Sequence, residues 1–291
     1  MAIPQYVSIT DFTAHAQVRA MHAVFDEAGG HALGLRLAVG VMTSRKIYGD
    51  DPDYRFRKVF PEPGQFAEIF APFTAEELGT CPPPYYVLHY ADYEGHGVEI
   101  DRHLRLVTKW AGPALDALQL DMVWPDPDGL APYRRDHPHL PIILQVGRRA
   151  MEEVHGDATE MVHRLRPYVE GRLIDAVLLD RSGGDGIDLE PFRLAYEMDL
   201  LSRVYRDAVD AGGLGFVLAG GLCAEAIRAG RLRPFGERRY GFSIDAQRKL
   251  HVGHGLFQPV DWEEEAPNYL RAGIAFFREL KEMHAGTLPG G

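Results

Sequence analysis

The segment richest in chemically informative residues is Leu178–Leu189, which reads Leu-Leu-Asp-Arg-Ser-Gly-Gly-Asp-Gly-Ile-Asp-Leu. It is an apolar run that ends in the carboxylate of Asp180 and continues into Gly183, Gly184 and Gly186. A carboxylate at the end of a buried strand is suited to acid-base chemistry. Glycines beside it let the backbone approach an anion closely. This pattern predicts an acid next to an anion-binding loop.

A second glycine turn follows the apolar run Val217–Ala219, where Gly220 and Gly221 precede a predicted helix over Ala224–Ala229. Backbone amides at the start of a helix can bind phosphate. Either glycine pair by itself is also typical of a tight strand-to-helix turn. Because the two turns occur on successive units, they favour a site for a small phosphorylated or anionic substrate.

Other chemistries are less well supported by the sequence. Two close histidine pairs, His137-Pro138-His139 and His251-Val252-Gly253-His254, have no evident third ligand. A looser set of possible ligands is His89, Asp92, Glu94 and Asp121. Cys81 and Cys223 form no C-x-x-C pair, so reduced thiols are expected. We therefore predict no metal and no cofactor.

The sequence also gives no support for a triad hydrolase, a P-loop nucleotide-binding protein or a Schiff-base enzyme. The chain contains no Gly-x-Ser-x-Gly elbow and no Walker loop. None of its five lysines lies within an apolar run that could be a strand, although Lys249 is near the end of one. These absences leave acid-base chemistry at strand ends as the leading interpretation.

Short apolar runs alternate with helical patterns along the whole chain. The helical patterns include Val18, Met21 and Phe25, then Leu194, Met198, Leu201 and Tyr205, then Leu270, Ile274 and Phe277. The predicted strands are Tyr6–Thr10, Gly34–Met42, Tyr85–His89, Ala117–Val123, Leu140–Val146, Ile174–Asp180, Gly215–Ala219 and Tyr240–Asp245. Such alternation predicts an α/β fold with a parallel sheet.

A closed (β/α)8 barrel is the expected architecture. A doubly wound open sheet would usually carry a glycine-rich turn after the first strand, and the sequence after Tyr6–Thr10 has none. We expect residues 1–291 to form one barrel domain. The segment 44–84 is longer than a minimal connection, and Phe66–Phe70 within it could add a helix. It is predicted to be a lid-like insertion at the mouth of the barrel.

On these motifs the chain resembles the phosphoribosylanthranilate isomerase family. The strongest match is the pairing of Leu-Leu-Asp…Gly-Gly-x-Gly with Leu-Ala-Gly-Gly-Leu, and specific motifs are confined to Ile174–Ile227. Thr43-Ser44-Arg45 falls where the family has Ser-Pro-Arg, and Leu118-Gln119-Leu120-Asp121 resembles its Val-Gln-Leu-His. The resemblance implies a (β/α)8 fold and an Amadori rearrangement of a phosphorylated aminosugar in tryptophan biosynthesis.

Two segments depart from that family pattern. Thr10 stands where the family has its cysteine base, and Asp11 is the candidate to replace that base. At the eighth strand, Asp245 replaces a phosphate-binding serine and would repel a phosphate dianion. Arg248 or Lys249 could compensate for this charge.

The leading functional hypothesis is therefore a sugar-phosphate isomerase of the aldose–ketose type, an intramolecular oxidoreductase. Its predicted catalytic residues are Asp180 as general acid and Asp11 as base, with Thr10 beside them. The predicted substrate-binding residues are Arg45, Gln119, Gly183, Gly184, Gly186, Gly220, Gly221, Asp245 and Arg248. The alternatives are a relative with a different small-ligand reaction and a non-catalytic binding protein on the same scaffold.

The composition and charge of the chain limit the kinds of partner that it is expected to bind. The chain has 31 Lys and Arg against 42 Asp and Glu, a formal charge of −11, which argues against binding to nucleic acids or to anionic membranes. The amino terminus lacks the basic and apolar regions of a signal peptide, and no apolar run approaches about 18 residues. We expect a cytoplasmic protein with a small anionic substrate, and the oligomeric state stays open.

Overall fold

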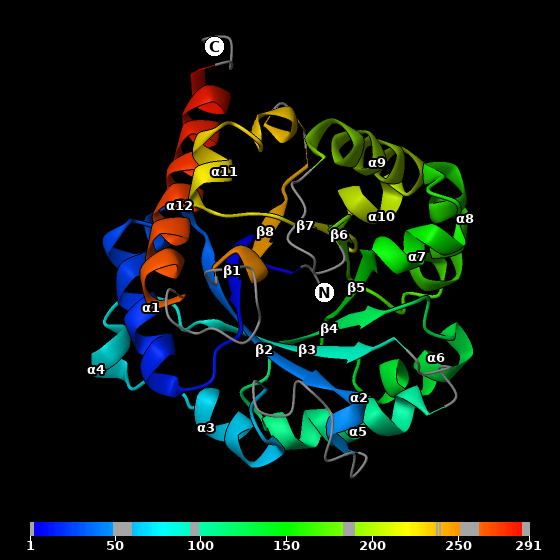
Figure 1. Cartoon of the computed structure of the whole chain (residues 1–291), viewed down its shortest axis with the longest axis horizontal. Coiled ribbons are helices and arrows are strands. Elements are labelled where there is room, and N and C mark those ends of the chain that lie inside the picture. Colours follow the sequence, from blue (N-terminus) through cyan, green and yellow to red (C-terminus); the bar gives the residue numbers. More distant parts are fainter. Residues whose placement is uncertain are drawn as a thin grey trace.

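Eight parallel strands close into a barrel in the computed structural model, in the order β1 to β8, with β8 hydrogen-bonded back to β1. The structure describes residues 3–48, 60–93, 99–182, 190–236, 238, 240–250 and 262–286. Helices surround the strands on all sides (Figure 1). The strands are β1 Tyr6–Thr10, β2 Arg36–Ser44, β3 Tyr85–Asp92, β4 Ala117–Met122, β5 Ile142–Gly147, β6 Ala176–Asp180, β7 Gly215–Ala219 and β8 Ser243–Ala246. The predicted (β/α)8 fold is confirmed.

Each predicted strand corresponds to an observed one, and the bounds of β1 and β7 agree at both ends. The largest shifts are of three residues, at the end of β3, which continues to Asp92 rather than stopping at His89, and at the start of β8, which begins at Ser243 rather than at Tyr240. Tyr240 instead packs its ring 5.1 Å from that of Phe216 and donates its hydroxyl to Asp199 at 2.6 Å. The side chain of Tyr240 thus contacts β7 and Asp199 of the helical layer, and the residue lies before the first residue of β8.

Alternate residues of the strands point into the barrel and form a separate apolar core. Tyr6 of β1 stacks on Tyr85 of β3 inside it, with ring centroids 5.8 Å apart. Ile3 packs against the same core, which consists of Tyr6, Ala38, Tyr85, Val87, Ala117, Ile143, Ala176, Leu178, Val217 and Ala219. The barrel is thus filled by side chains, as is usual for this fold.

The outward-facing strand residues pack against the helices. The helices are α1 His15–Glu27, α2 Arg45–Tyr48, α3 Phe66–Ile69, α4 Ala75–Leu78, α5 Ile100–Ala111, α6 Pro127–Asp136, α7 Arg148–Glu153, α8 Ala158–Glu170, α9 Pro191–Val204, α10 Arg206–Asp210, α11 Ala224–Arg228 and α12 Trp262–Gly286. Short 3₁₀ turns are η1 His31–Leu33, η2 Pro63–Gln65, η3 Arg233–Phe235 and η4 Arg248–Leu250. None of the helices in the described ranges has the length and apolarity needed to cross a bilayer.

The helical periodicity in the sequence identifies the buried faces of α1, α9 and α12. Val18, Met21 and Phe25 are buried on α1, for example. On α12, Gly273 lies so close to β1 and β8 that an added Cβ would meet Ile244 at 3.0 Å and Val7 at 3.3 Å. A glycine there lets α12 pack directly on the seam where the barrel closes.

The described part of the segment after β2 contributes to the helical layer. Helix α3 packs between α1 and α5, and Phe66 and Ile69 are buried in the core between sheet and helices. Nearer the mouth, Ile47 and Phe60 pack with Met42 and Ala91 at the ends of β2 and β3. Residues 49–59 lie outside the described residues, so the lid stays a prediction.

At the amino-terminal end of the barrel, buried carboxylates bind strand amides. Asp175 accepts the Ile142 N–H at 2.9 Å and pairs with Arg134 at 2.9 Å. Asp116 accepts the Tyr86 N–H at 2.8 Å in the same way. Both residues precede a strand and hold the first residues of its neighbour, so this face serves stability.

We predict that Asp175→Ala destabilises the protein by about 2–3 kcal/mol, because it leaves the Ile142 N–H without its acceptor and Arg134 without its carboxylate, although Arg134 keeps its bonds to two backbone carbonyl oxygens. Urea unfolding should show a lower midpoint at an unchanged m value. The matched control is Glu170→Ala, which removes an exposed ion pair to Arg166 and should change stability by about 0.5 kcal/mol or less. Equal effects of the two variants would contradict this role for Asp175.

Candidate active site

Polar side chains gather at the carboxyl ends of the strands, directly above the apolar core of the barrel. The alternation that turns Ala117 and Ala176 inward continues to Gln119 and Asp180. The residues concerned are Thr10 of β1, His89 of β3, Gln119 and Asp121 of β4, Gln145 of β5, Asp180 of β6 and Asp245 of β8. In barrels of this kind the active site is formed at this end. We call this group of residues the mouth.

A chain of hydrogen bonds runs across three strands of the mouth to Asp180. The Gln119 amide donates to Gln145 at 2.9 Å, and the Gln145 amide donates to Asp180 Oδ2 at 3.3 Å. The other oxygen, Oδ1, accepts the Ser182 backbone N–H at 2.9 Å and its hydroxyl at 2.7 Å. Asp180 is buried, and donors to both of its oxygens fix its orientation.

Gly220 is required for this arrangement. Its φ of +93° is left-handed, and an added Cβ would lie 2.7 Å from Asp180 Oδ1 and 3.4 Å from Ser182 Cβ. A side chain at this position would therefore displace the carboxylate. The glycine turn that the sequence marks after β7 gives Asp180 its space.

Asp121 is the second carboxylate in this part of the mouth, and Tyr93 donates its hydroxyl to it. Burial raises the pKa of Asp121 to about 7, and the negative charge of Asp180 adds to this effect, whereas the Tyr93 hydrogen bond and Arg149 oppose it. The Arg149 guanidinium lies over the Tyr93 ring, 4.7 Å from its centroid. Two carboxylates close enough to influence each other hold one proton near neutral pH.

On the opposite strands, the turn after β1 brings two consecutive side chains to the mouth. Thr10 donates to Asp245 at 3.1 Å, and Gln247 donates to Asp11 at 3.0 Å. A regular strand would turn these neighbours to opposite faces, but Asp11 has a φ of +82°. Its N–H donates to the Gly40 carbonyl at 3.1 Å. Because Asp11 is left-handed, side chains no longer alternate between the two faces here, and both Thr10 and Asp11 contact residues at the end of β8.

His89 lies beneath this group and is buried. Its Nε2 has no hydrogen-bond partner among the described residues. Burial lowers the pKa of His89, although Asp245 and Asp11 oppose this shift. An added Cβ on Gly40 would lie 2.9 Å from His89 Nε2 and 2.4 Å from Thr10 Oγ1. Gly40 thus leaves room for a neutral imidazole with an available nitrogen.

The structure brings together Thr10, Asp11, Gln119, Asp180 and Asp245 from the residues that the sequence indicated, with Gly220 and Gly221 in the turn after β7. Arg45 is instead bound to Asp92, with Nε 3.1 Å from Oδ1, so its contact with substrate stays a prediction. Gly183, Gly184 and Gly186 lie outside the described residues. Arg248 begins η4 after β8.

Sequence reasoning placed His89 and Asp121 only in a looser set of possible metal ligands, and it did not single out Tyr93 or Gln145. For Asp121 a signal was present, because it lies two residues after Gln119 and so shares its face of the strand. Gln145 has the same position on β5, where it follows the inward Ile143. Counting alternate residues from the apolar core outward would have found both.

Comparison with known proteins shows the fold alone. No family model and no curated protein matches the sequence. The α subunit of tryptophan synthase from Legionella pneumophila is similar in structure, with a TM-score of 0.55, 10% identity, and coverage of 96% of this chain and 93% of that one. A chitinase domain from Pyrococcus furiosus also has a TM-score of 0.55 and 10% identity, over 100% and 99% of the chains.

Phosphoribosylanthranilate isomerase from Thermus thermophilus has 20% identity and a TM-score of 0.48, over 95% of this chain and 100% of that one. The two matches with a TM-score of 0.55 agree with the (β/α)8 barrel seen in the structure, a scaffold on which many enzymes are built. The chemistry of the protein therefore depends on the residues of the mouth. Its carboxylates, one with a pKa near neutrality, equip it to donate and accept protons.

We predict that Asp180→Asn lowers the pKa of Asp121 from about 7, because it removes the negative charge that helps to raise it. Tyr93→Phe should raise the same pKa, since it removes the hydrogen bond that stabilises the carboxylate. Carboxyl ¹³C NMR titration of the wild type and both variants measures these shifts. Shifts of the same sign in both variants would contradict the assigned environment.

The same property affects stability in a defined direction. The folded pKa of about 7 exceeds the unfolded value of about 3.9, so the folded state holds an extra proton between these pH values. The free energy of unfolding therefore falls as the pH rises through this window. Asp121→Asn should remove that part of the slope in urea unfolding at a series of pH values.

Proposed function

We propose that this protein is an isomerase that moves protons on a small sugar-phosphate substrate, with the Asp121–Asp180 pair as its proton source. The observation that carries the proposal is the half-buried Asp121, which has a pKa of about 7 and is influenced by the fixed carboxylate of Asp180 at the barrel mouth. A general acid is most effective when its pKa is near the working pH.

An Amadori rearrangement needs two proton transfers. An acid protonates the ring oxygen, and the C1–O bond breaks to open the sugar as an iminium ion. A base then removes the C2 proton, and an enolamine forms that relaxes to the ketose. Asp180 delivers the first proton in this scheme, because the neighbouring Asp121 lets the pair hold one proton that either carboxylate can carry.

Asp11 is the proposed base for the second transfer. Its left-handed backbone turns it to the end of β8, and the Gln247 amide orients its carboxylate. Backbone conformations of this kind are concentrated at functional sites. Thr10 beside it hydrogen-bonds Asp245 and is a substrate-positioning residue in this scheme.

The phosphate part of the proposal rests on the glycine turns. Gly220 and Gly221 both have left-handed φ angles, of +93° and +65°, after β7. The glycine segment 183–186 follows β6 in the sequence. In (β/α)8 barrels, phosphate is frequently bound by the loops near the end of the chain.

A second candidate is an acid-base enzyme whose small substrate carries no phosphate. The observation that favours it is the number of carboxylates: Asp11, Asp121, Asp180 and Asp245 all belong to the mouth. Asp245 stands where the isomerase resemblance calls for a phosphate-binding serine. Negative charge at that point disfavours a dianion and suits a neutral or cationic ligand.

Turnover of phosphoribosylanthranilate tests the first candidate. Asp180→Asn should lower kcat by roughly 100-fold or more, because an amide cannot deliver the ring-opening proton, while KM changes less. Asp11→Ala should abolish activity, and Thr10→Ala should keep most of it. A folded Asp180→Asn variant with full activity would remove Asp180 from the reaction.

An inactive wild type would reject the isomerase proposal. Tight binding of a small ligand without turnover would then favour a non-catalytic binding protein. Turnover of a substrate without phosphate that depends on Asp121 and Asp180 would favour the second candidate.

Inorganic phosphate separates the two candidates. If the glycine turns bind it, phosphate should raise the melting temperature with a dependence that follows RT ln(1 + [L]/Kd). Gly221→Asp should abolish this protection, because it places a negative charge at the turn. Gly221→Asn is the matched control, since Asn and Asp both tolerate a φ of +65°. Equal protection in both variants would show that phosphate does not bind at this turn.

A further inference from the structure

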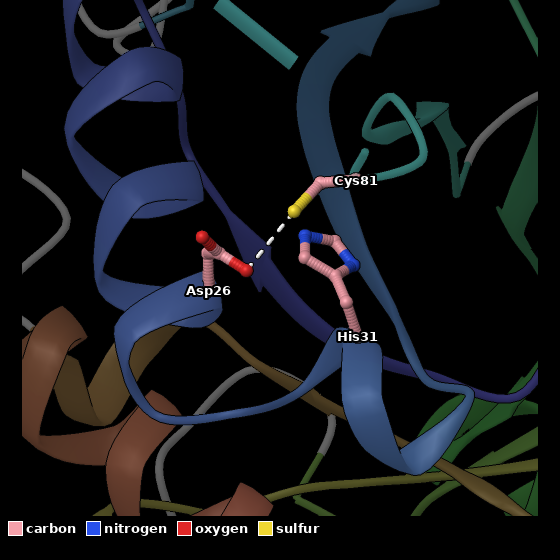
Figure 2. A group of neighbouring side chains, drawn as sticks. All are labelled: Asp26, His31 and Cys81. Carbon is pink, nitrogen blue, oxygen red and sulfur yellow. Dashed lines mark hydrogen bonds between the residues drawn. The ribbon is translucent and has the colours of Figure 1, made fainter. Parts of the chain in front are cut away.

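A cluster of three different donor side chains lies at the amino-terminal end of the barrel, away from the mouth. Asp26 is near the end of α1, His31 begins η1 before β2, and Cys81 lies in the segment before β3. The Asp26 oxygen, a His31 ring nitrogen and the Cys81 sulfur lie within 4.8 Å of one another. In Figure 2 a ring nitrogen of His31 is directed toward the gap between the other two groups.

The two acidic members of the cluster already interact. The Cys81 thiol donates to Asp26 Oδ1 at 3.0 Å (Figure 2). This hydrogen bond is the main cause of a raised pKa of the Cys81 thiol. The Asp26 oxygen and the Cys81 sulfur therefore lie next to each other, as two ligands of one metal ion would.

His31 supplies the second and independent observation. Both of its ring nitrogens are buried, and neither makes a hydrogen bond of normal length and angle among the described residues, although the Leu35 backbone is near enough to affect the ring. A buried polar atom without a partner costs about 1–3 kcal/mol, so such atoms are uncommon unless they serve a ligand. Burial and the neighbouring charges of His22 and Arg36 lower the pKa of His31, although Asp26 opposes this. The neutral imidazole is the form that binds metals.

The local sequence holds His31 in this position. Gly29 ends α1 with a φ of +80°, and Gly30 then passes over Phe25 so closely that an added Cβ would lie 2.3 Å from its ring. The Phe25 and His31 rings then pack edge to face with centroids 4.9 Å apart. Two consecutive glycines thus let the chain turn directly from the helix into His31.

The segment that carries Cys81 is held separately. Arg36 donates to the carbonyl oxygens of Pro83 and Pro84. A ring nitrogen of His22 lies 3.2 Å from the Pro82 carbonyl oxygen, and the Cys81 N–H donates to Leu78 at 2.8 Å. Consecutive prolines restrict the backbone further. Cys81 is therefore placed by contacts that do not depend on Asp26 or His31.

We propose that Asp26, His31 and Cys81 form a structural site for a transition-metal ion of the Zn²⁺ class. One sulfur, one imidazole nitrogen and one carboxylate oxygen are all ligands that Zn²⁺ accepts. Ligands at about 2.0–2.3 Å in tetrahedral geometry are roughly 3.5 Å apart. The Asp26 oxygen and the Cys81 sulfur, now 3.0 Å apart, would separate by about 0.5 Å, and no two of the three ligand atoms are more than 4.8 Å apart. Side-chain rotation of the exposed Asp26 and the partly exposed Cys81 supplies this movement.

Metal binding replaces the thiol proton. The metal–sulfur bond forms as the S–H bond breaks, and the proton leaves to solvent through the side that exposes Asp26. Water takes the fourth position. The ion would link the end of α1 to the segments before β2 and β3, on the face of the barrel where stability rather than catalysis is expected. Gly40 and Met42, which pair with Thr10 and His89 of the mouth, lie roughly 13–20 Å along β2 from its first residue, Arg36.

The test uses the full-length, untagged, reduced protein, with Co²⁺ as a spectroscopic probe for Zn²⁺. We expect one equivalent of Co²⁺ to bind with a thiolate-to-cobalt charge-transfer band in the near ultraviolet, and Zn²⁺ to displace it. Cys81→Ser should abolish the band. Asp26→Asn and His31→Gln should each weaken Co²⁺ affinity about tenfold or more. Cys223→Ser is the matched control for thiol loss and should leave binding unchanged.

Three outcomes would overturn the proposal. They are no stoichiometric Co²⁺ binding, a charge-transfer band that survives in Cys81→Ser, and unchanged affinity in both Asp26→Asn and His31→Gln, which would indicate binding by the thiol alone. X-ray absorption of the Zn²⁺-loaded wild type needs no variant to fold. It should show one sulfur at about 2.3 Å, and a shell of nitrogen and oxygen alone would also overturn the site.

Discussion

Closure of the sheet between β1 and β8 is the constraint on which the mouth depends. Val7 pairs with Ile244 and Ile9 with Ala246, residues that lie more than 200 positions apart in the chain. This pairing brings the Thr10 hydroxyl to Asp245 and the Asp11 carboxylate to Gln247. The same parallel register continues around the barrel and aligns Gln119, Gln145 and Asp180. An open sheet of the same strands would hold the second group together and lose the first.

The mouth combines this geometry with poor solvation. Apolar side chains fill the barrel below the carboxylates, so charge at Asp121 is stabilised by the Tyr93 hydroxyl and by Arg149 rather than by water. Three donors reach the two oxygens of Asp180, whereas burial raises the pKa of Asp121 to about 7, so two chemically identical groups that share a proton lie in different environments. Differences in environment between paired carboxylates are a general means of dividing acid and base roles.

The sequence predicts the barrel well, because strands buried on both faces are nearly continuous apolar runs and their helices keep a 3.6-residue period. It also indicates which residues end the strands, such as Thr10 and Asp180. It does not indicate the pKa of Asp121, which depends on Asp180 of another strand. It also does not indicate the left-handed φ of Asp11, which interrupts the alternation of side chains at the end of β1. Asp26, His31 and Cys81 have no motif spacing, since the connection between β1 and β2 and the segment before β3 bring them together. These features arise from packing between distant segments, which local patterns do not encode.

The φ of +82° at Asp11 has a consequence for how this barrel can change over evolutionary time. Glycine, asparagine and aspartate are the residues that adopt such a conformation at little cost, and aspartate alone among them carries a charge. A single-nucleotide change suffices to convert an aspartate codon to one for asparagine or glycine. The backbone would accept either replacement without repacking, so the carboxylate at this point can be gained or lost while the barrel around it stays intact. The mouth is thus a place where descendants of one fold can exchange a reactive group for a passive one in a single step.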